Sequence, residues 1–237
     1  MSRASDACFI LNTRAEIHRA RTEAAFAGLP WPVVHWPMFT ARPTGADWPA
    51  PEEFDAVIFT SQIAVPLVPL AWRAKTAYAV GEATAATARD AGFGDVFVTG
   101  IDATQMIETL KGIAFRRALY PSATDVAEDV AAALPDKITR LPVYAMDPEP
   151  ELPAWLIERL RGAARVVAPL FSRRNAAQLA AVLRRAGLAG LIDAIGVSSD
   201  VFERGTASWR TQNVAVQPTL DSVVAELRRV IGAEAAL

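Results

Sequence analysis

Short apolar runs alternate along this chain with longer, Ala-rich segments whose apolar positions recur every three or four residues. The first pattern is typical of buried strands and the second of helices. Strands are predicted at residues 7–11, 32–36, 56–59, 76–80, 95–98, 118–120, 138–143, 164–168, 191–195 and 214–217. Helices are predicted at residues 15–27, 63–70, 82–91, 104–110, 125–134, 153–161, 173–186, 199–204 and 221–231. Such alternation predicts an α/β protein, and the number of strands favours two parallel sheets with helices on both faces.

One kind of strand ending occurs twice. The stretch FTSQIAV (59–65) follows an apolar run, ends it in two hydroxyl residues and then changes to a helical pattern. The stretch PLFSRRNAA (169–177) has the same layout, with Ser172 in the place of Ser61. Matching parts that recur in one order indicate duplication of one α/β half.

A second related pair, YAVGEATAA and AIGVSSDVF, places Gly81 and Gly196 at equivalent turns, where we expect both at positive φ. The residues alone leave the arrangement of the halves open. They either fold one after the other, divided near Gly112, or interleave. Two Pro-marked crossings, at 35–43 and 141–150, lie at equivalent places and are candidate hinge strands between two lobes.

The composition narrows the possible partners. The chain has 237 residues, of which 52% are hydrophobic, enough for sizeable cores. Its 24 basic and 26 acidic residues form no basic run, which argues against nucleic acid and anionic membranes as partners. The single cysteine, Cys8, excludes an internal disulfide and a cysteine-based metal cluster. We find no signal-peptide pattern and no long apolar window, and therefore expect a cytoplasmic protein.

Six predicted strand-to-helix turns are rich in hydroxyl or small residues. In a parallel sheet, ligands bind at the carboxyl ends of strands, and a helix start offers free N–H groups to an anion. Two lobes presenting such turns to each other would form a cleft for several carboxylates or phosphates. The alternative is that the Ser and Thr residues only cap helices. The turns read FTSQ, VGEAT, YPSAT, LFSRRN, IGVSS and QPTLD.

Other catalytic patterns are missing from the sequence. Gly81 and Gly196 belong to neither a dinucleotide-binding nor a phosphate-loop motif. His18 lies in a predicted helix beside Arg19 and is expected to face solvent, whereas His35 lies in a predicted strand. Two histidines without a Cys or carboxylate pattern do not predict a metal site. No nucleophile elbow or Ser-His-Asp arrangement is readable.

Seven motifs follow one another along almost the whole chain: TRAE (13–16), VIFTSQIAV (57–65), YAVGEATAATARDAGF (78–93), LPVYAMDPEP (141–150), APLFSRRNAAQL (168–179), AIGVSSDVFERG (194–205) and VAVQPTLDSVVAEL (214–227). In order and spacing they resemble the uroporphyrinogen-III synthase family. The resemblance implies two similar parallel-sheet α/β lobes from an internal duplication, interleaved and joined by a two-stranded hinge. One lobe would comprise 1–37 with 148–237 and the inserted lobe 42–142, with hinge strands at 38–41 and 143–147.

The resemblance also implies an activity. Members of this family are lyases of porphyrin and heme biosynthesis that cyclise the linear tetrapyrrole hydroxymethylbilane, with loss of water and inversion of ring D, to uroporphyrinogen III. No metal or organic cofactor is implied, and we expect a monomer. The alternative is a non-catalytic module on the same fold that binds a tetrapyrrole or another polycarboxylate.

Candidate site residues follow from the matching motifs. Tyr144 in LPVYAM occupies the place of the family's hinge tyrosine, and its phenol is the predicted acid at the leaving hydroxyl. The alternative is that Tyr144 only packs. The predicted substrate-binding residues are Arg14, Thr60, Ser61, Gln62, Gly81, Thr84, Ser122, Ser172, Arg173, Gly196, Ser198 and Ser199.

Two motifs depart from the family pattern. IGVSSD carries Val197 where the family usually has Pro, and Asp200 adds a negative charge beside a predicted carboxylate-binding turn. This departure favours the non-catalytic alternative. FSRRN replaces the usual Phe-Ser-Pro-Ser, so that Arg173 and Arg174 are either direct carboxylate partners or solvated helix residues.

Overall fold

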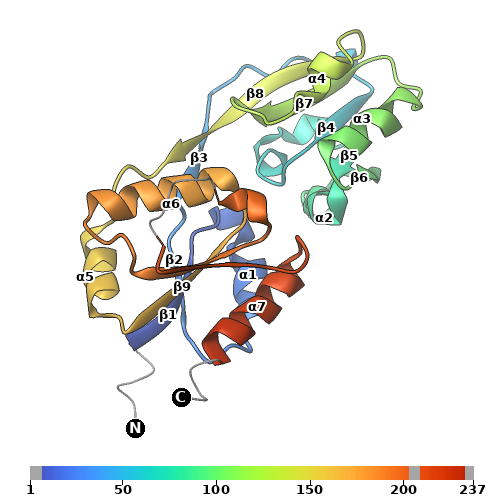
Figure 1. The fold of residues 1–237 in the computed structure, drawn as a ribbon. Coiled ribbons are helices and arrows are strands. Elements are labelled where there is room, and N and C mark those ends of the chain that lie inside the picture. Colours follow the sequence, from blue (N-terminus) through green and yellow to red (C-terminus); the bar gives the residue numbers. More distant parts are fainter. Residues whose placement is uncertain (1–6, 203–208, 233–237) are drawn as a thin grey trace. The chain divides into compact units, whose positions relative to one another are not determined.

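The computed structural model describes residues 7–202 and 209–232, and the chain divides into two compact units. Unit 1 comprises Met1–Thr40 and Pro148–Leu237, and unit 2 comprises Ala41–Asp147. A five-stranded sheet has the order β11-β10-β9-β1-β2, and a six-stranded sheet has the order β3-β8-β7-β4-β5-β6 (Figure 1). The predicted α/β class with two parallel-dominated sheets is therefore confirmed.

The five-stranded sheet of unit 1 is parallel throughout. Helices α1 and α7 share a core with its strands through Phe26, Leu227 and Ile195. Helices α5 and α6 lie on the opposite face (Figure 1). The elements are β1 (Cys8–Asn12), η2 (Glu16–His18), α1 (Arg19–Phe26), β2 (Val33–His35), α5 (Ala154–Gly162), β9 (Arg165–Leu170), α6 (Arg173–Arg185), β10 (Ile192–Gly196), η6 (Ser199–Val201), β11 (Thr211–Val214) and α7 (Leu220–Gly232).

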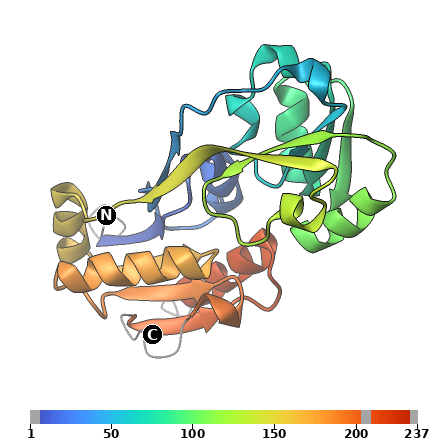
Figure 2. The same cartoon turned by 90° about the horizontal axis from the view of Figure 1, so that it is seen from above.

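The six-stranded sheet of unit 2 separates two cores. Helix α2 shares one core with Phe59 and Tyr144, whereas α3 and α4 share the other with Ile58 and Tyr120. Adjacent residues of one strand thus enter different cores, because side chains alternate across a sheet. The ribbon of these elements is seen from a second direction in Figure 2. The elements are β3 (Phe39–Pro43), η3 (Pro51–Glu53), β4 (Ala56–Phe59), η4 (Val65–Leu67), η5 (Leu70–Trp72), β5 (Thr76–Val80), α2 (Gly81–Asp90), β6 (Val96–Gly100), α3 (Ala103–Lys111), β7 (Ala118–Ala123), α4 (Val130–Ala133) and β8 (Ile138–Pro148).

Strands β3 and β8 contain the two points at which the chain passes from one unit to the other. The amide of Thr44 donates to the carbonyl of Val143 at 3.0 Å, and that of Glu149 donates to Met38 at 2.9 Å. Residue numbers rise along one strand as they fall along the other, so the pair is antiparallel. The apolar pattern did not predict β3 as a sheet strand, because its exposed residues 40–43 are polar or Pro in three of four places.

Two predicted helices of unit 2 are wrong wholly or in part. Residues 63–70 form the short 3₁₀ segments η4 and η5, because Pro66 and Pro69 lack the N–H groups that an α-helix needs. Of the predicted helix 125–134, only α4 forms. Its start is fixed by Asp129, whose Oδ1 accepts from the amide of Ala131 at 2.9 Å.

Two predictions in unit 1 also need correction. The last strand is β11, three residues before the predicted 214–217, because the polar stretch 211–213 pairs with β10 through its backbone. Of the predicted helix 199–204, the structure has the 3₁₀ segment η6, which ends at Val201 and is followed by an extended Phe202. Residues 203–204 lie outside the described residues.

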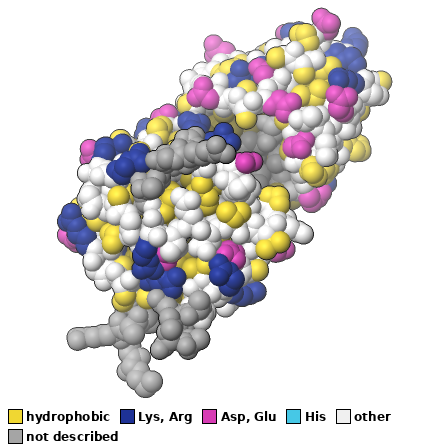
Figure 3. Space-filling model, viewed as in Figure 1, with side chains coloured by type: hydrophobic (Ala, Val, Ile, Leu, Met, Phe, Trp, Pro, Cys, Tyr) yellow, Lys and Arg dark blue, Asp and Glu magenta, His cyan; other side chains and the backbone are white. Residues whose placement is uncertain are grey.

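Charged side chains are spread over the surface. On the face drawn in Figure 3, Lys and Arg side chains are interspersed with Asp and Glu side chains. This distribution accords with a formal net charge of −2 for the sequence. None of the helices in the described part of the chain is long and apolar enough to cross a membrane.

A buried carboxylate joins three strands of unit 1. Asp193 of β10 is fully buried, and its Oδ2 lies 2.7 Å from Nε of Arg165 on β9. Its Oδ1 lies 3.0 Å from Nε of Arg210 and accepts from the Thr211 hydroxyl at 2.7 Å. Burial by itself would raise the pKa of Asp193, but the hydrogen bonds from Arg210, Arg165 and Thr211 outweigh it and hold the pKa below its usual value.

We expect Asp193→Asn to lower the free energy of unfolding at neutral pH by about 3 kcal/mol, because two arginines lose their buried counter-charge. The carboxylate stabilises the fold fully above its unfolded pKa of about 4, and this contribution disappears as pH falls through the lowered folded pKa. Urea denaturation at several pH values should therefore show the difference from wild type shrinking in acid. Asp136→Asn, at an exposed position, is the matched control. A difference that persists undiminished in acid would contradict this account.

Candidate functional site

The carboxyl ends of β4 and β7 and the middle of β8, where Tyr144 pairs with the last residue of β7, bring several predicted residues together in the unit 2 sheet. These strands are neighbours and run parallel. Along β7 and β8 the register shifts, so that Ser122 pairs with Pro142 but Ala123 pairs with Tyr144. The shift leaves Val143 without a partner residue on β7, and Val143 and Tyr144 then both enter the core that contains α2.

Tyr144 of β8 is buried, with only 4% of its surface exposed. Burial raises the pKa of its phenol, and a hydrogen bond with Ser61 lowers it in part. The phenol is therefore protonated at neutral pH and able to donate. Ser61 also accepts from the amide of Ile63 at 3.2 Å, which orders the turn after β4.

A second phenol lies at the same strand ends. Tyr120 of β7 is fully buried, and its hydroxyl is 3.0 Å from that of Thr60. Burial raises the pKa of Tyr120. The bond to Thr60 and the charge of Arg140 oppose the rise, and the charge of Asp129 adds to it. The sequence analysis did not select Tyr120, although a polar ring inside the apolar run 118–120 is an available signal.

Arg140 of β8 orders the turn that follows β7. Its Nε donates to the Ser122 hydroxyl at 2.9 Å, and its Nη2 donates to the carbonyls of Ala123 at 2.9 Å and Thr124 at 2.6 Å. Ser122 is buried and donates in turn to the Ala123 carbonyl, so its hydroxyl is engaged within unit 2. The amide of Thr124 donates to the carbonyl of Tyr144 at 2.8 Å. Arg140 was also missed, since no local pattern marks its partners.

The remaining predicted residues of unit 2 surround the start of α2. Gly81 begins this helix at φ +69°, the conformation expected for it, which favours glycine. Thr84 is buried on the helix, and the Gln62 side chain accepts from the Thr87 hydroxyl at 3.2 Å. Of Gln62, Gly81 and Thr84, only Gly81 lies at the first position of a helix.

In unit 1, Arg14 follows the end of β1. Its amide donates to the Asn12 side chain at 3.2 Å, and its guanidinium lies 4.2 Å from the centre of the Phe171 ring. Nη1 is also 3.5 Å from the Thr22 hydroxyl, but Arg14 forms no ion pair with a described residue. Burial and the nearby charge of Arg21 lower the pKa of Arg14 to about 10, which still leaves it charged at neutral pH.

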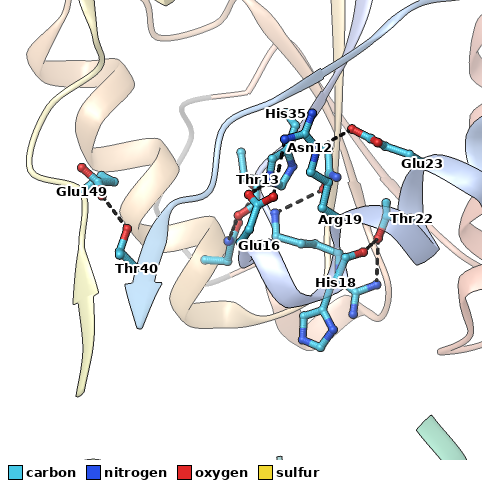
Figure 4. Close-up of polar contacts among 12 residues, drawn as sticks. Asn12, Thr13, Glu16, His18, Arg19, Thr22, Glu23, His35, Thr40 and Glu149 are labelled. Atoms are coloured by element: carbon cyan, nitrogen blue, oxygen red, sulfur yellow. Dashed lines mark hydrogen bonds and ion pairs between the residues drawn. The ribbon is translucent and has the colours of Figure 1, made fainter. Parts of the chain in front are cut away.

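His18 differs from the solvent-facing histidine that we expected. It is half-buried, and burial, followed by the charges of Arg14 and Arg21, lowers its pKa to about 4. Figure 4 shows its ring directed away from Asn12 and Thr13 at the start of α1. His18 is therefore neutral at neutral pH, and the positive charge here is that of the arginines.

Ser172 caps α6, and the capped residue, Asn175, forms hydrogen bonds with Thr13 after the end of β1. The Ser172 hydroxyl accepts from the amide of Asn175 at 3.2 Å. The Asn175 side chain accepts from the Thr13 hydroxyl at 2.7 Å and donates to the Thr13 carbonyl at 3.0 Å. The helix start and the strand end are thereby held together in unit 1.

The other turn of unit 1 follows β10. Gly196 does not have the positive φ that we expected. It is required for a different reason, because an added Cβ would lie 2.7 Å from Cε2 of Phe202 and 2.8 Å from the Ser198 carbonyl. Ser198 precedes η6 without forming a side-chain cap, and Ser199 is exposed.

Arg173 and Arg174 begin α6 and make different contacts. Arg173 is exposed, and its Nε donates to the carbonyl of Asp200 at 3.0 Å. The guanidinium of Arg174 lies 4.6 Å from the centre of the Phe39 ring. The charged group of Arg173 thus ties the two turns of unit 1 while remaining open to solvent.

Comparison with known proteins identifies the family. The model for "Uroporphyrinogen-III synthase HemD" matches residues 21–225. The chain belongs to the uroporphyrinogen-III synthase family. No curated protein sequence gave a significant match.

A solved structure of a uroporphyrinogen-III synthetase shares the fold. The uroporphyrinogen-III synthetase of Helicobacter pylori 26695 superposes with a TM-score of 0.67 at 16% identity, covering 94% of this chain and 99% of that one. A mutant synthase of the extremely thermophilic bacterium Thermus thermophilus gives a TM-score of 0.48 at 15% identity, covering 96% and 100%. At 16% identity the Helicobacter pylori match concerns the fold alone, and the lower TM-score of the Thermus thermophilus match supports no conclusion.

In this family member, the predicted residues form one group in each unit. Unit 2 supplies the hydroxyls of Thr60, Ser61 and Tyr144 at adjacent strand ends. Unit 1 supplies Arg14 and the capped start of α6. The first group can donate protons and hydrogen bonds, and the second suits an anion.

We expect Ser172→Ala to lower the free energy of unfolding by about 1 kcal/mol, because α6 loses its cap and Asn175 loses one of its fixed contacts. Ser199→Ala, at an exposed position where no side-chain hydrogen bond to a described residue is found, should change it by less than about 0.5 kcal/mol. Urea denaturation followed by circular dichroism measures both. Equal effects of the two substitutions would show that the cap does not stabilise α6.

Proposed function

We propose that this protein cyclises hydroxymethylbilane to uroporphyrinogen III with inversion of ring D, acting as a lyase that releases water. Membership of the uroporphyrinogen-III synthase family supports the substrate and product. The single observation that carries the chemistry is the buried, protonated phenol of Tyr144 beside Ser61 in the unit 2 sheet. Its place in the LPVYAM motif is the place of the family's hinge tyrosine.

In the proposed first step, Tyr144 donates a proton or a hydrogen bond to the hydroxyl of the hydroxymethyl group. The carbon–oxygen bond breaks, water leaves, and the pyrrole nitrogen supplies the electron pair that forms an azafulvene. Ring D then attacks through its substituted carbon to give a spiro intermediate, which fragments and closes again in the inverted sense. Loss of a proton restores the last pyrrole and balances the proton gained by the leaving group.

The substrate carries eight carboxylates, and the protein offers groups that suit them. The start of α2 at Gly81 and the start of α6 after Ser172 present backbone amides. Arg14 adds a half-buried cation whose guanidinium has no described carboxylate partner. Recognition by amides and one arginine requires no net positive charge, in keeping with a net charge of −2.

The test of this function is the isomer of the product. Hydroxymethylbilane generated in situ closes spontaneously to the type I isomer, whereas the proposed enzyme gives type III. The porphyrins obtained after oxidation can be separated by liquid chromatography. A protein that binds the tetrapyrrole but leaves only type I product would be the non-catalytic module.

Tyr144→Phe should lower kcat by up to about 100-fold while leaving KM nearly unchanged, because the phenol acts mainly in the transition state. The ring remains, so the core around Phe59 should persist. Steady-state rates and isomer ratios should be compared with those of Tyr78→Phe, a tyrosine of the same sheet that lies outside the site and should retain wild-type activity. Unchanged turnover would leave Tyr144 with a packing role only.

Arg14→Gln should raise KM for hydroxymethylbilane by about tenfold with little change in kcat, because a charge-assisted contact to a carboxylate is lost. It should also raise the pKa of His18 from about 4 towards its ordinary value, since a repelling charge is removed. The chain has only two histidines, so NMR titration can follow both.

Arg19→Gln is the matched control for this substitution. Arg19 belongs to the same segment but is paired at the surface with Glu16 and Glu23. It should leave KM unchanged. If Arg14→Gln shifts the His18 pKa but not KM, Arg14 is not a substrate contact.

A further inference from the structure

The end of β4 is placed between two tyrosine side chains. Phe59 and Tyr144 belong to the core that contains α2, whereas Ile58 and Tyr120 belong to the core that contains α3 and α4. The two phenol rings therefore approach the strand end from opposite faces of the sheet. Each hydroxyl interacts with one residue of the turn: Tyr120 with Thr60 and Tyr144 with Ser61.

The contact of Tyr120 is the better fixed of the two. Its ring is fully buried, among Ile58, Met106 and Leu110, and so has little freedom to move. Its hydroxyl lies 3.0 Å from that of Thr60. Breaking this bond would leave a buried polar group unpaired, which is costly. The position of Thr60 is thus tied to a rigid part of the core.

Thr60 and Ser61 are joined by one peptide bond, so a displacement of the first moves the second. Tyr144 packs in one core with Phe59 and Ala64, which lie before and after this turn, and a hydrogen bond with Ser61 lowers the pKa of its phenol in part. The Tyr144 backbone is held separately, by the amide of Thr124 at 2.8 Å. The direction of the Tyr144 hydroxyl therefore depends on where β4 ends, and this in turn depends on Tyr120.

We propose that Tyr120 is a positioning residue, which acts through Thr60 and Ser61 to orient the hydroxyl of Tyr144. The inference rests on the proposed function, in which Tyr144 assists departure of the substrate hydroxyl. With no exposed surface, Tyr120 does not touch the substrate. Any effect of its hydroxyl on turnover must pass through the strand end.

The hydrogen bond can be removed from either side. Tyr120→Phe deletes the phenol hydroxyl, Thr60→Val deletes its partner, and Thr60→Ser keeps it. We expect Tyr120→Phe and Thr60→Val each to lower kcat for hydroxymethylbilane about fivefold, the equivalent of one hydrogen bond, with KM within about twofold of wild type. The double variant should be no slower than either single one, because both remove the same bond. Thr60→Ser should restore kcat, and Tyr78→Phe should leave it unchanged.

A spectroscopic readout reports on Tyr144 without turnover. The chain has three tyrosines, so protein labelled with ¹³C at the phenol carbon gives three resonances that the three Tyr→Phe variants assign. The Tyr144 resonance should shift in Thr60→Val and Tyr120→Phe and return in Thr60→Ser. A residue that only stabilises the fold would lower the unfolding midpoint and leave this resonance in place.

Each outcome decides the proposal. Additive losses of kcat in the double variant, wild-type kcat in Tyr120→Phe, or an unmoved Tyr144 resonance would each overturn it. Should Tyr120→Phe fail to fold by circular dichroism, the Tyr144 resonance of Thr60→Val and Thr60→Ser, measured without substrate, gives the decision, because kcat of a Thr60 variant would also report a lost substrate contact. A wild-type protein that yields only the type I isomer would overturn the proposed function instead, and the Tyr144 resonance would still show whether Tyr120 orients it.

Discussion

Parallel pairing of β4, β7 and β8 is the constraint on which the arrangement of Thr60, Ser61 and Tyr144 in unit 2 depends. Parallel strands end at one edge, so polar residues at the carboxyl ends of separate chain segments become neighbours. The register shift at Ser122 and Ala123 directs the Tyr144 side chain into the core that contains α2. Burial there raises the pKa of the phenol, so its hydroxyl stays protonated. A regular ladder would place consecutive residues of β8 on alternate faces.

In unit 1, the charge state of each buried or half-buried group depends on the charged groups around it. Arg14 keeps its charge although it is half-buried, and His18 loses its own because burial and the arginines disfavour a third cation. Asp193 shows the opposite case, in which a fully buried carboxylate stays ionised because two arginines and a threonine surround it. Asp193 thus stays ionised through its partners, whereas Arg14 stays charged because its pKa of about 10, although lowered, is still well above neutral pH.

Local pattern was sufficient for much of the fold and for only part of the site. Strands β4 and β5 have the predicted bounds, because a buried apolar run ended by polar residues has few other structures available. Residues 63–70 look helical in their apolar spacing, but two prolines prevent the hydrogen bonds. The positive φ of Gly81 could be predicted from its turn. Gly196 is required because Phe202 packs closely against it, and no local sequence pattern reveals this contact. Tyr120 and Arg140 escaped for a similar reason, since the Thr60 partner of Tyr120 is 60 residues away in sequence.

The antiparallel pair β3 and β8 has a consequence for how such a chain is built. At one end of the pair, Arg42 and Asp147 form an ion pair at 2.8 Å, and both belong to unit 2. At the other end, the Thr40 hydroxyl donates to Glu149 at 2.9 Å within unit 1 (Figure 4). In each unit, the two chain segments that lead to the other unit therefore lie side by side. A chain that leaves and re-enters a unit at neighbouring points needs no long linker there, and this is the arrangement that tolerates domain insertion.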